Sequence, residues 1–262
     1  MRRGELFWGI LLVVLGALFF LKTAGFLVGD VFGWFWPLVI IAVGIWILMG
    51  GFYRRSQYEK AEKFSIPLQE AREARLTIQH GAGHVELRAG ADAGDFLTGV
   101  SGMGMNQKTR VVDGKLEVEI EAGPSFIPFV GPEGGTWEYR LNQDVPMQIK
   151  VEAGASRLDL NLTDLKVSRF SYEGGASTVN LTLPARVENS LVDLEAGAAS
   201  VDVQVPEGVA IRLRTKSVGS LDVDQQRFPM REKGLYQSAD YDAAKYRADV
   251  TIDGGVTSIR VH

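Results

Sequence analysis

The feature that most constrains this chain is a short turn of small residues that recurs about every twenty positions and leads each time into alternating apolar and polar residues. The first apolar residues after four consecutive turns, Leu158, Val179, Val201 and Leu221, lie 21, 22 and 20 residues apart. The clear copies are six: 81–87, 152–160, 173–181, 195–203, 216–223 and 253–261. A fixed period of this length is typical of stacked rungs.

The alternation beside each turn indicates how the rungs pack, because successive side chains of a strand point to opposite faces. Leu158 and Leu160 point inward together, whereas Asp159 between them points outward. One rung cannot bury its own apolar row, but parallel neighbours about 4.8 Å apart cover one another. We therefore predict an all-β soluble domain, a single-stacked β-solenoid of about eight rungs of roughly 20–22 residues. The two weaker rungs are placed at 100–104 and 121–123.

The solenoid is expected to span 74–262, after a polar linker or cap at 54–73. Two inserts break the period, a Pro-rich and aromatic segment at 124–146 and a Tyr-bearing segment at 224–246. The second is predicted to be a surface excursion before a closing rung at 250–252.

The apolar sequence is concentrated at the N-terminus. Uncharged runs at 6–21 and 32–49 approach the roughly 20 residues needed to cross a bilayer. They predict an α-helical transmembrane hairpin over 1–53, with spans at about 6–26 and 32–50. A cleaved signal peptide is the alternative for the first run, but no small-x-small cleavage site followed by polar sequence appears. A buried core hairpin is a further alternative, which an all-round apolar helix disfavours.

Charges beside the spans predict their orientation. Arg2 and Arg3 precede the first run, and Arg54 and Arg55 follow the second. The positive-inside rule then places both termini in the cytoplasm of a multi-pass protein of the bacterial cytoplasmic membrane. Small residues let transmembrane helices approach closely, so the expected helix-pairing positions are Gly9, Gly16 and Gly44.

Composition excludes several classes of function. The first 55 residues carry a net charge of +3, and the remainder, with 23 basic and 30 acidic residues, carries −7. An acidic domain without a basic face is an unlikely partner for nucleic acid. With 0 Cys there is no disulfide and no thiolate site. No phosphate-binding Gly-x-x-x-x-Gly-Lys or Gly-x-Ser-x-Gly motif occurs, so we expect no enzyme, no cofactor and no small-molecule substrate.

Stacking in register would align carboxylates in two rows. Like charges about 5 Å apart splay into water, raise their pKa values or bind a cation. A solvated polar face is the default, with cation binding and cleavage of an acidic polysaccharide as alternatives. The corner row is Glu152, Glu173 and Glu195, and the row along one face is Asp159, Asp202 and Asp222, with Asn180 between the first two.

Aromatic and imidazole groups give weaker signals. His80 and His84 bracket the first turn and are expected to be surface histidines, because a turn does not place such a pair on one side as a helix does. The Pro-rich insert either forms a contact lip or folds back and buries its own rings. Its interaction candidates are Phe126, Ile127, Phe129 and Trp137.

Two segments resemble a known bacterial family. The stretches at 3–12 and 36–46, with the basic stop at Arg54 and Arg55, resemble the two-helix membrane region of LiaF-like proteins. The repeated Glu-Ala-Gly-Ala and Glu-Gly-Gly-Ala turns, and the closing segment 254–261, are similar to the toast-rack, adhesin-like β domains that often follow it.

This resemblance implies regulation rather than catalysis, since LiaF-like proteins restrain a membrane sensor kinase that responds to envelope damage. We therefore expect a membrane-anchored regulator or sensor component of the envelope stress response. Its expected partners are the lipid bilayer and either a sensor kinase or copies of itself. The alternative is an outward-facing adhesin-like module that binds a cation, polysaccharide or another cell.

Overall fold

A computed structural model describes residues 62–101, 105–122 and 136–262. The chain divides into two compact units, 1–57 and 58–262, and all described residues belong to the second. The predicted helical hairpin, with Gly9, Gly16 and Gly44, lies outside the described residues, as do Phe126, Ile127 and Phe129.

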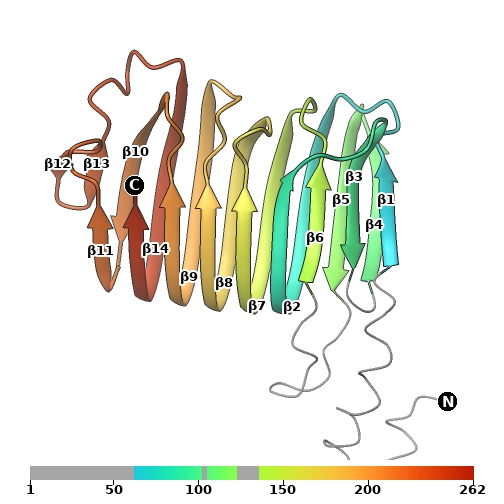
Figure 1. The fold of residues 1–262 in the computed structure, drawn as a ribbon, viewed down its shortest axis with the longest axis horizontal. Coiled ribbons are helices and arrows are strands. Elements are labelled where there is room, and N and C mark those ends of the chain that lie inside the picture. Colours follow the sequence, from blue (N-terminus) through green and yellow to red (C-terminus); the bar gives the residue numbers. More distant parts are fainter. Residues whose placement is uncertain (1–61, 102–104, 123–135) are drawn as a thin grey trace, which may run out of the picture. The chain divides into compact units, whose positions relative to one another are not determined.

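The described part of the chain is all-β, as the repeat predicts, and its strands join in one continuous sheet (Figure 1). The strands are β1 (Glu62–Pro67), β2 (Glu73–Ala89), β3 (Asp95–Ser101), β4 (Met105–Val112), β5 (Lys115–Ala122), β6 (Thr136–Leu141), β7 (Met147–Asn161), β8 (Val167–Thr182), β9 (Asn189–Gln204), β10 (Val209–Lys216), β11 (Ser220–Val223), β12 (Met230–Glu232), β13 (Leu235–Gln237) and β14 (Tyr246–Val261).

The long strands β2, β7, β8, β9 and β14 each bend back on themselves at a turn of small residues (Figure 1). The burial pattern of β7 marks the bend, because Ile149 and Val151 are buried before it and Leu158 and Leu160 after it, with a change of phase between. We call the part before the bend the first arm and the part after it the second arm. The inner side chains of the two arms form the core.

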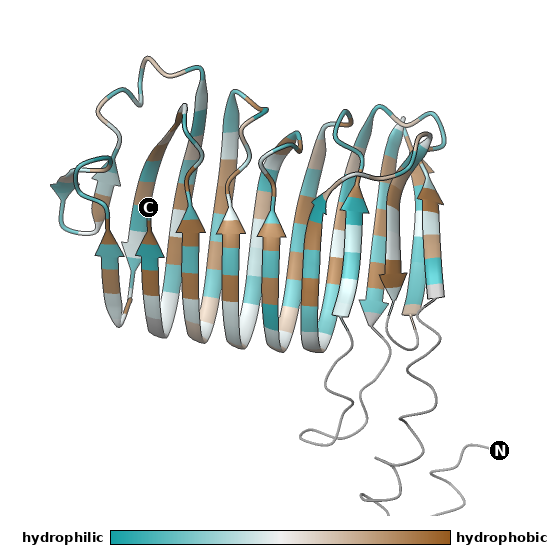
Figure 2. Cartoon of the chain, viewed as in Figure 1, coloured by the Kyte–Doolittle hydropathy of each residue, from teal (hydrophilic) through white to brown (hydrophobic). Residues whose placement is uncertain are grey.

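Neighbouring bent strands pair in parallel and in register. Ile78 in β2 lies beside Val151 in β7, which lies beside Tyr172 in β8 and then Leu194 in β9. Each of these side chains is at most 1% exposed, because each is covered by the rungs on either side. Figure 2 shows the result as apolar and polar bands that continue from strand to strand.

All six clear copies of the sequence repeat fall at such turns, in β2, β7, β8, β9 and β14 and between β10 and β11. The predicted corners are therefore confirmed. The order of the rungs is not what the period predicts, however. β14 pairs with β9 on one side and with β10 and β11 on the other. The predicted closing rung at 250–252 is thus an interior rung, and β10 with β11 forms the last one.

The N-terminal end of the stack also departs from a simple series. β5 and β6 pair in parallel with the first and second arms of β2, so together they form the rung beside it. β3 and β4, which flank the weak rung predicted at 100–104, run antiparallel to β6 and β5. The prediction of a parallel rung there is wrong. β1, within the predicted linker, adds an outer strand to β3.

The second insert is more than a surface excursion. Its β13 pairs antiparallel with β10, and its Phe228 and Tyr241 are 1% and 5% exposed. Phe228 belongs to the hydrophobic core, and the ring of Tyr241 lies 4.2 Å from the guanidinium group of Arg212 in β10, so the insert packs on the last rung and acts as a cap.

The bends require glycine because successive corners touch. A Cβ atom added at Gly154 would lie 2.4 Å from the carbonyl oxygen of Gly81 in the rung beside it. At Gly197, the equivalent position in β9, the same atom would lie 3.4 Å from the carbonyl oxygen of Gly175. The corners therefore pack most tightly between β2 and β7.

This difference gives a matched pair of substitutions. Gly154→Ala should lower the free energy of unfolding by about 1–3 kcal/mol, because the new methyl group forces two backbones apart. Gly197→Ala should change it by less than about 0.5 kcal/mol. Denaturant unfolding of the full chain in detergent, followed by circular dichroism, measures both. Equal losses would show that corner contact does not set the cost.

Candidate functional site

The outer face of the second arms, which we call the polar face, carries the aspartate row that the sequence singles out, together with His84. Parallel register aligns its middle row across the stack. In spatial order that row is Glu138, Glu86, Asp159, Asn180, Asp202, Arg260 and Asp222. The predicted alignment of Asp159, Asn180 and Asp202 is therefore found. Arg260 separates Asp202 from Asp222 because β14 stands between β9 and β11.

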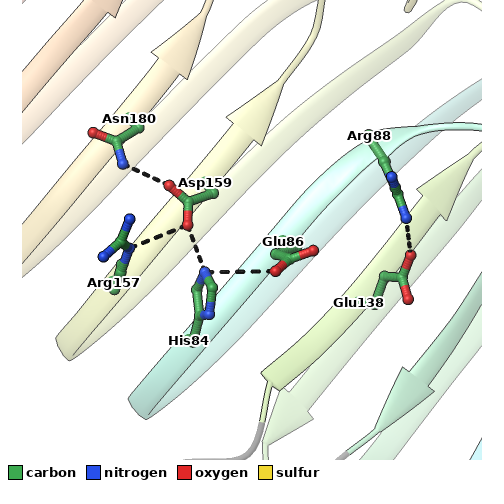
Figure 3. Close-up of polar contacts among 7 residues, drawn as sticks. All are labelled: His84, Glu86, Arg88, Glu138, Arg157, Asp159 and Asn180. Atoms are coloured by element: carbon green, nitrogen blue, oxygen red, sulfur yellow. Dashed lines mark hydrogen bonds and ion pairs between the residues drawn. The ribbon is translucent and has the colours of Figure 1, made fainter.

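Asp159 is the centre of a hydrogen-bonded cluster (Figure 3). The Nε2 atom of His84 lies 2.5 Å from its Oδ2 atom, and the Nε atom of Arg157 lies 3.2 Å from the same oxygen. The amide of Asn180 donates to Oδ1 at 2.5 Å. An ionised carboxylate only accepts hydrogen bonds, so His84 presents a protonated Nε2 to it. The cluster joins three consecutive rungs, β2, β7 and β8.

These contacts set the charge of Asp159. Burial pushes the pKa of its carboxyl upward, but the donors Asn180, His84 and Arg157 outweigh that effect, and the pKa lies below its usual value. Both oxygens are engaged by side chains. Asp159 therefore remains ionised and has no free oxygen turned toward its carboxylate neighbours in the row.

The other members of the predicted Asp row also meet basic groups. Asp202 lies 2.9 Å from Nε2 of His262 and 3.9 Å from a guanidinium nitrogen of Arg260, and Asp222 lies 3.5 Å from Nε of Arg260. Each of the three aspartates of the predicted row therefore contacts at least one basic side chain. Within the described ranges, no three His, Cys, Asp or Glu side chains are placed to hold a metal.

A basic side chain also contacts two of the glutamates at the corner. Glu152, Glu173 and Glu195 are neighbours in register, as predicted. The Nζ atom of Lys150 lies 2.7 Å from Glu152 and 2.9 Å from Glu173, and these carboxylates raise the pKa of the lysine. Gln79 donates a further hydrogen bond to Glu152 at 3.1 Å. Sequence reasoning missed Lys150, although its position two residues before Glu152 places it on the same outer face.

A shallow depression of about 260 Å³ lies in the polar face. Its polar lining comes from β2, β7, β8 and β9 and includes Arg88, Asn161, Thr182 and Gln204 beside the middle row. The lining offers amide, hydroxyl, carboxylate and guanidinium groups to a partner. It has no thiol, and two of its carboxylates, Asp159 and Asp202, contact side chains of neighbouring rungs. This chemistry suits recognition of a polar surface by hydrogen bonds and ion pairs.

Two of the ring side chains that the sequence singles out are in the core. Trp137, for which a contact lip and a buried ring are the two alternatives, is 4% exposed and stacks beside Tyr139 with ring centroids 6.4 Å apart. His80, expected at the surface, is 5% exposed and meets Trp137 edge to face at 5.4 Å. Strand parity, a signal that the sequence contains, accounts for both positions. His80 is two residues after inward Ile78, and Trp137 two before inward Tyr139.

The fold and this face define a class of protein: a stack of bent, parallel β-strands with a broad, polar outer face. The chain belongs to the toast-rack family, since residues 54–204 match the model of its N-terminal domain. Residues 6–48 match the model of the LiaI-LiaF-like transmembrane region, so the resemblance found in the sequence is confirmed for 6–48 and for 54–204. No helix in the described part of the chain is long and apolar enough to span a membrane.

One solved structure shares the fold. It is a protein from Clostridium sporogenes described as a "putative cell adhesion protein", with 20% sequence identity and a TM-score of 0.70. The match covers 77% of this chain and 98% of that one. At this identity the likeness concerns the fold alone. No curated protein matches the chain.

Burial of His80 predicts a dependence of stability on pH. Burial lowers its pKa below the ordinary 6.5, against a weaker opposing effect of the Ala82 backbone, and neither ring nitrogen has a hydrogen-bond partner among the described residues. Below pH 6.5 the unfolded chain binds a proton that the folded chain resists. The contribution to the free energy of unfolding is therefore constant above that pH and falls below it, by at most about 1.4 kcal/mol per pH unit.

The comparison of two histidine variants isolates this effect. In His80→Leu, the free energy of unfolding should fall less than in the unchanged chain as the pH is lowered from 6.5 to the lowered pKa of His80. His84→Gln, a substitution at a half-buried surface position, should leave this fall as it is in the unchanged chain. Denaturant midpoints of the full chain measured across this pH range provide the readout. An unchanged pH profile in His80→Leu would contradict the assignment.

Proposed function

We propose that this chain is a membrane-anchored, non-enzymatic regulator of the bacterial cell-envelope stress response that acts through protein contacts. The match of residues 6–48 to a LiaI-LiaF-like transmembrane region supports the anchor. The contact role rests on one observation, the polar face. Carboxylates predominate along its middle row, and contacts between rungs such as Arg88 with Glu138 and Arg260 with Asp202 hold several of them in place. A surface whose charges complement those of a partner steers the encounter and disfavours wrong partners.

In this proposal the helical hairpin localises the protein and pairs with other membrane helices through Gly9, Gly16 and Gly44. Both termini are cytoplasmic, because the basic residues flank the outer ends of the two spans. The stacked domain then presents its polar face to a membrane sensor kinase or to a second copy of the chain. The kinase is held in one state while this contact lasts.

A second function, adhesion or binding of wall polymer outside the cell, is favoured by the fold shared with the Clostridium sporogenes protein. The amide and hydroxyl groups of Asn161, Asn180 and Thr182 in the shallow depression are suited to a neutral or weakly charged polysaccharide. This function requires the stacked domain to lie on the outer side of the membrane.

Membrane topology separates the two functions. A C-terminal fusion to alkaline phosphatase should be inactive and a C-terminal fusion to a fluorescent protein that folds only in the cytoplasm should be bright, because the second span ends in Arg54 and Arg55. Changing both arginines to Gln should weaken this preference. Phosphatase activity of the unchanged chain would exclude the regulatory role as stated and support adhesion.

Photo-crosslinking tests the partner and the face together. The chain has 0 Cys, so a single cysteine carries the crosslinker unambiguously. Thr178→Cys, exposed on the polar face, should capture a sensor kinase in native membranes, whereas Leu191→Cys, exposed on the outer face of the first arms, should not. The captured protein is identified by mass spectrometry. Capture of the kinase by Leu191→Cys alone would show that the contact lies on the outer face of the first arms and not on the polar face. Absence of a kinase from both captures would overturn the regulatory role.

A further inference from the structure

β4 is an open edge of the sheet. Among the described strands it pairs only with β5, and every residue from Asn106 to Val112 is exposed. The other terminal strands are shorter or interrupted. β11 has 4 residues, β12 has 3, and β1 ends at Pro67 after an irregularity in its pairing. Short length, proline and charged side chains are devices that keep an edge from pairing with another chain. β4 has only the last of these, in Lys108 and Arg110, and carboxylates on an added strand would neutralise it.

The outer side of β4 is basic. Lys108 lies 3.4 Å from Glu119 and 3.3 Å from Glu121, and Arg110 lies 2.5 Å from Glu117. All three carboxylates belong to β5, on one side of the basic residues. The two basic side chains are 67% and 74% exposed. Charged side chains in a sheet interact most with those directly opposite on the next strand, so the open side has room for a second set of acidic partners.

The tip of β4 is apolar. Val111 and Val112 are 41% and 48% exposed, and they are two of the few large hydrophobic residues that the described chain leaves open to water. Val111 shares the inner side of the strand with Thr109, since each pairs with an inward residue of β5, Leu116 or Val118. A further strand laid against β4 would cover this surface and continue the core side of the sheet.

Charge decides which strand fits. Antiparallel pairing of two copies of β4, with their outer faces on the same side, is unfavourable in the registers that overlap most of the strand, because Lys108 or Arg110 then lies opposite itself or opposite the other. β5 shows what does fit, because Glu117, Glu119 and Glu121 alternate in it with Leu116, Val118 and Ile120. The complement of β4 is therefore an extended strand with carboxylates at alternate positions and apolar residues between them.

We infer that the free edge of β4 is a β-strand addition site for an extended, acidic segment of a partner protein. Main-chain hydrogen bonds supply the affinity in this mode of recognition, and the alternating side chains supply the choice of partner. The site lies on the first-arm side of the sheet, in strands distinct from those of the polar face. It does not depend on which partner the polar face binds or on which side of the membrane the domain lies.

The probe is a fluorescent peptide with the sequence of β5, the 8 residues Lys115–Ala122, capped at both ends and added to the full chain in lipid nanodiscs. Fluorescence anisotropy should report binding. A matched peptide in which the three glutamates are replaced by lysine should bind roughly tenfold more weakly, because attractive cross-strand pairs become repulsive. Equal binding of the two peptides would overturn the charge-based choice of partner.

Two further peptides test the main-chain mode. Each carries N-methyl groups on alternate residues, one set on even and the other on odd positions, so that each loses the hydrogen-bond donors along one edge. One of the two should lose binding and the other keep it, because an added strand pairs along a single edge. If both bind as well as the unmethylated peptide, the contact is not strand addition.

Exchange of charge on the protein completes the test. Lys108→Glu with Arg110→Glu should reverse the preference, so that the lysine peptide binds more tightly than the glutamate peptide. Arg169→Glu with Arg214→Glu, on other strands of the same outer face, should leave the preference unchanged. Lys108→Gln with Arg110→Gln covers the case in which the reversed charges unfold β4, and it should abolish the difference between the two peptides. A preference that survives in the glutamine variant would place the site elsewhere.

Discussion

In-register stacking of bent parallel strands is the interaction on which the rest of this structure depends. Each rung has two short apolar rows, one on each arm, and neither row is deep enough to be buried by its own rung. The neighbours on both sides cover them, as the row from Ile78 to Leu194 illustrates. The same pairing satisfies the backbone hydrogen bonds of every interior strand. Small residues at the bends follow from this requirement, because stacked corners bring backbones into contact at Gly81 and Gly154.

Stacking also sets the electrostatics of the outer faces. A side chain at a given position of one rung has the equivalent side chains of the next rungs as fixed neighbours, so a run of identical charges would repel along the whole stack. The chain limits this in two ways. In the polar face Asn180 and Arg260 interrupt the carboxylates beyond Asp159, and at the corner Lys150 bridges Glu152 and Glu173. The pattern of charge is therefore part of what permits the stack, as well as the feature that a partner would recognise.

Much of the fold could be predicted from the sequence, because the period of the turns and the parity of the strands are local signals. All six corners lie where the small residues place them, and the inner and outer rows follow the alternation. The parity of the strands also indicates that His80 and Trp137 are buried. That indication was obscured because both residues are polar or aromatic and lie near a turn. The order of the rungs could not be predicted. β10 and β14 carry the same pattern, so the repeat says which residues turn but not which rung lies beside which. The place of Arg260 between two aspartates was missed for that reason.

The position of β14 sets the order in which the far end of the stack can assemble. Its sixteen residues follow β10 and β11 in the chain, yet they lie in the interior of the stack, between β9 and β10. In a serial stack each rung could dock on the rung before it as soon as it was synthesised. Here β10 and β11 have no rung to stack on until β14 has been made and has paired with β9. The last rung and its cap therefore join the domain only after the strand that connects them to everything before them.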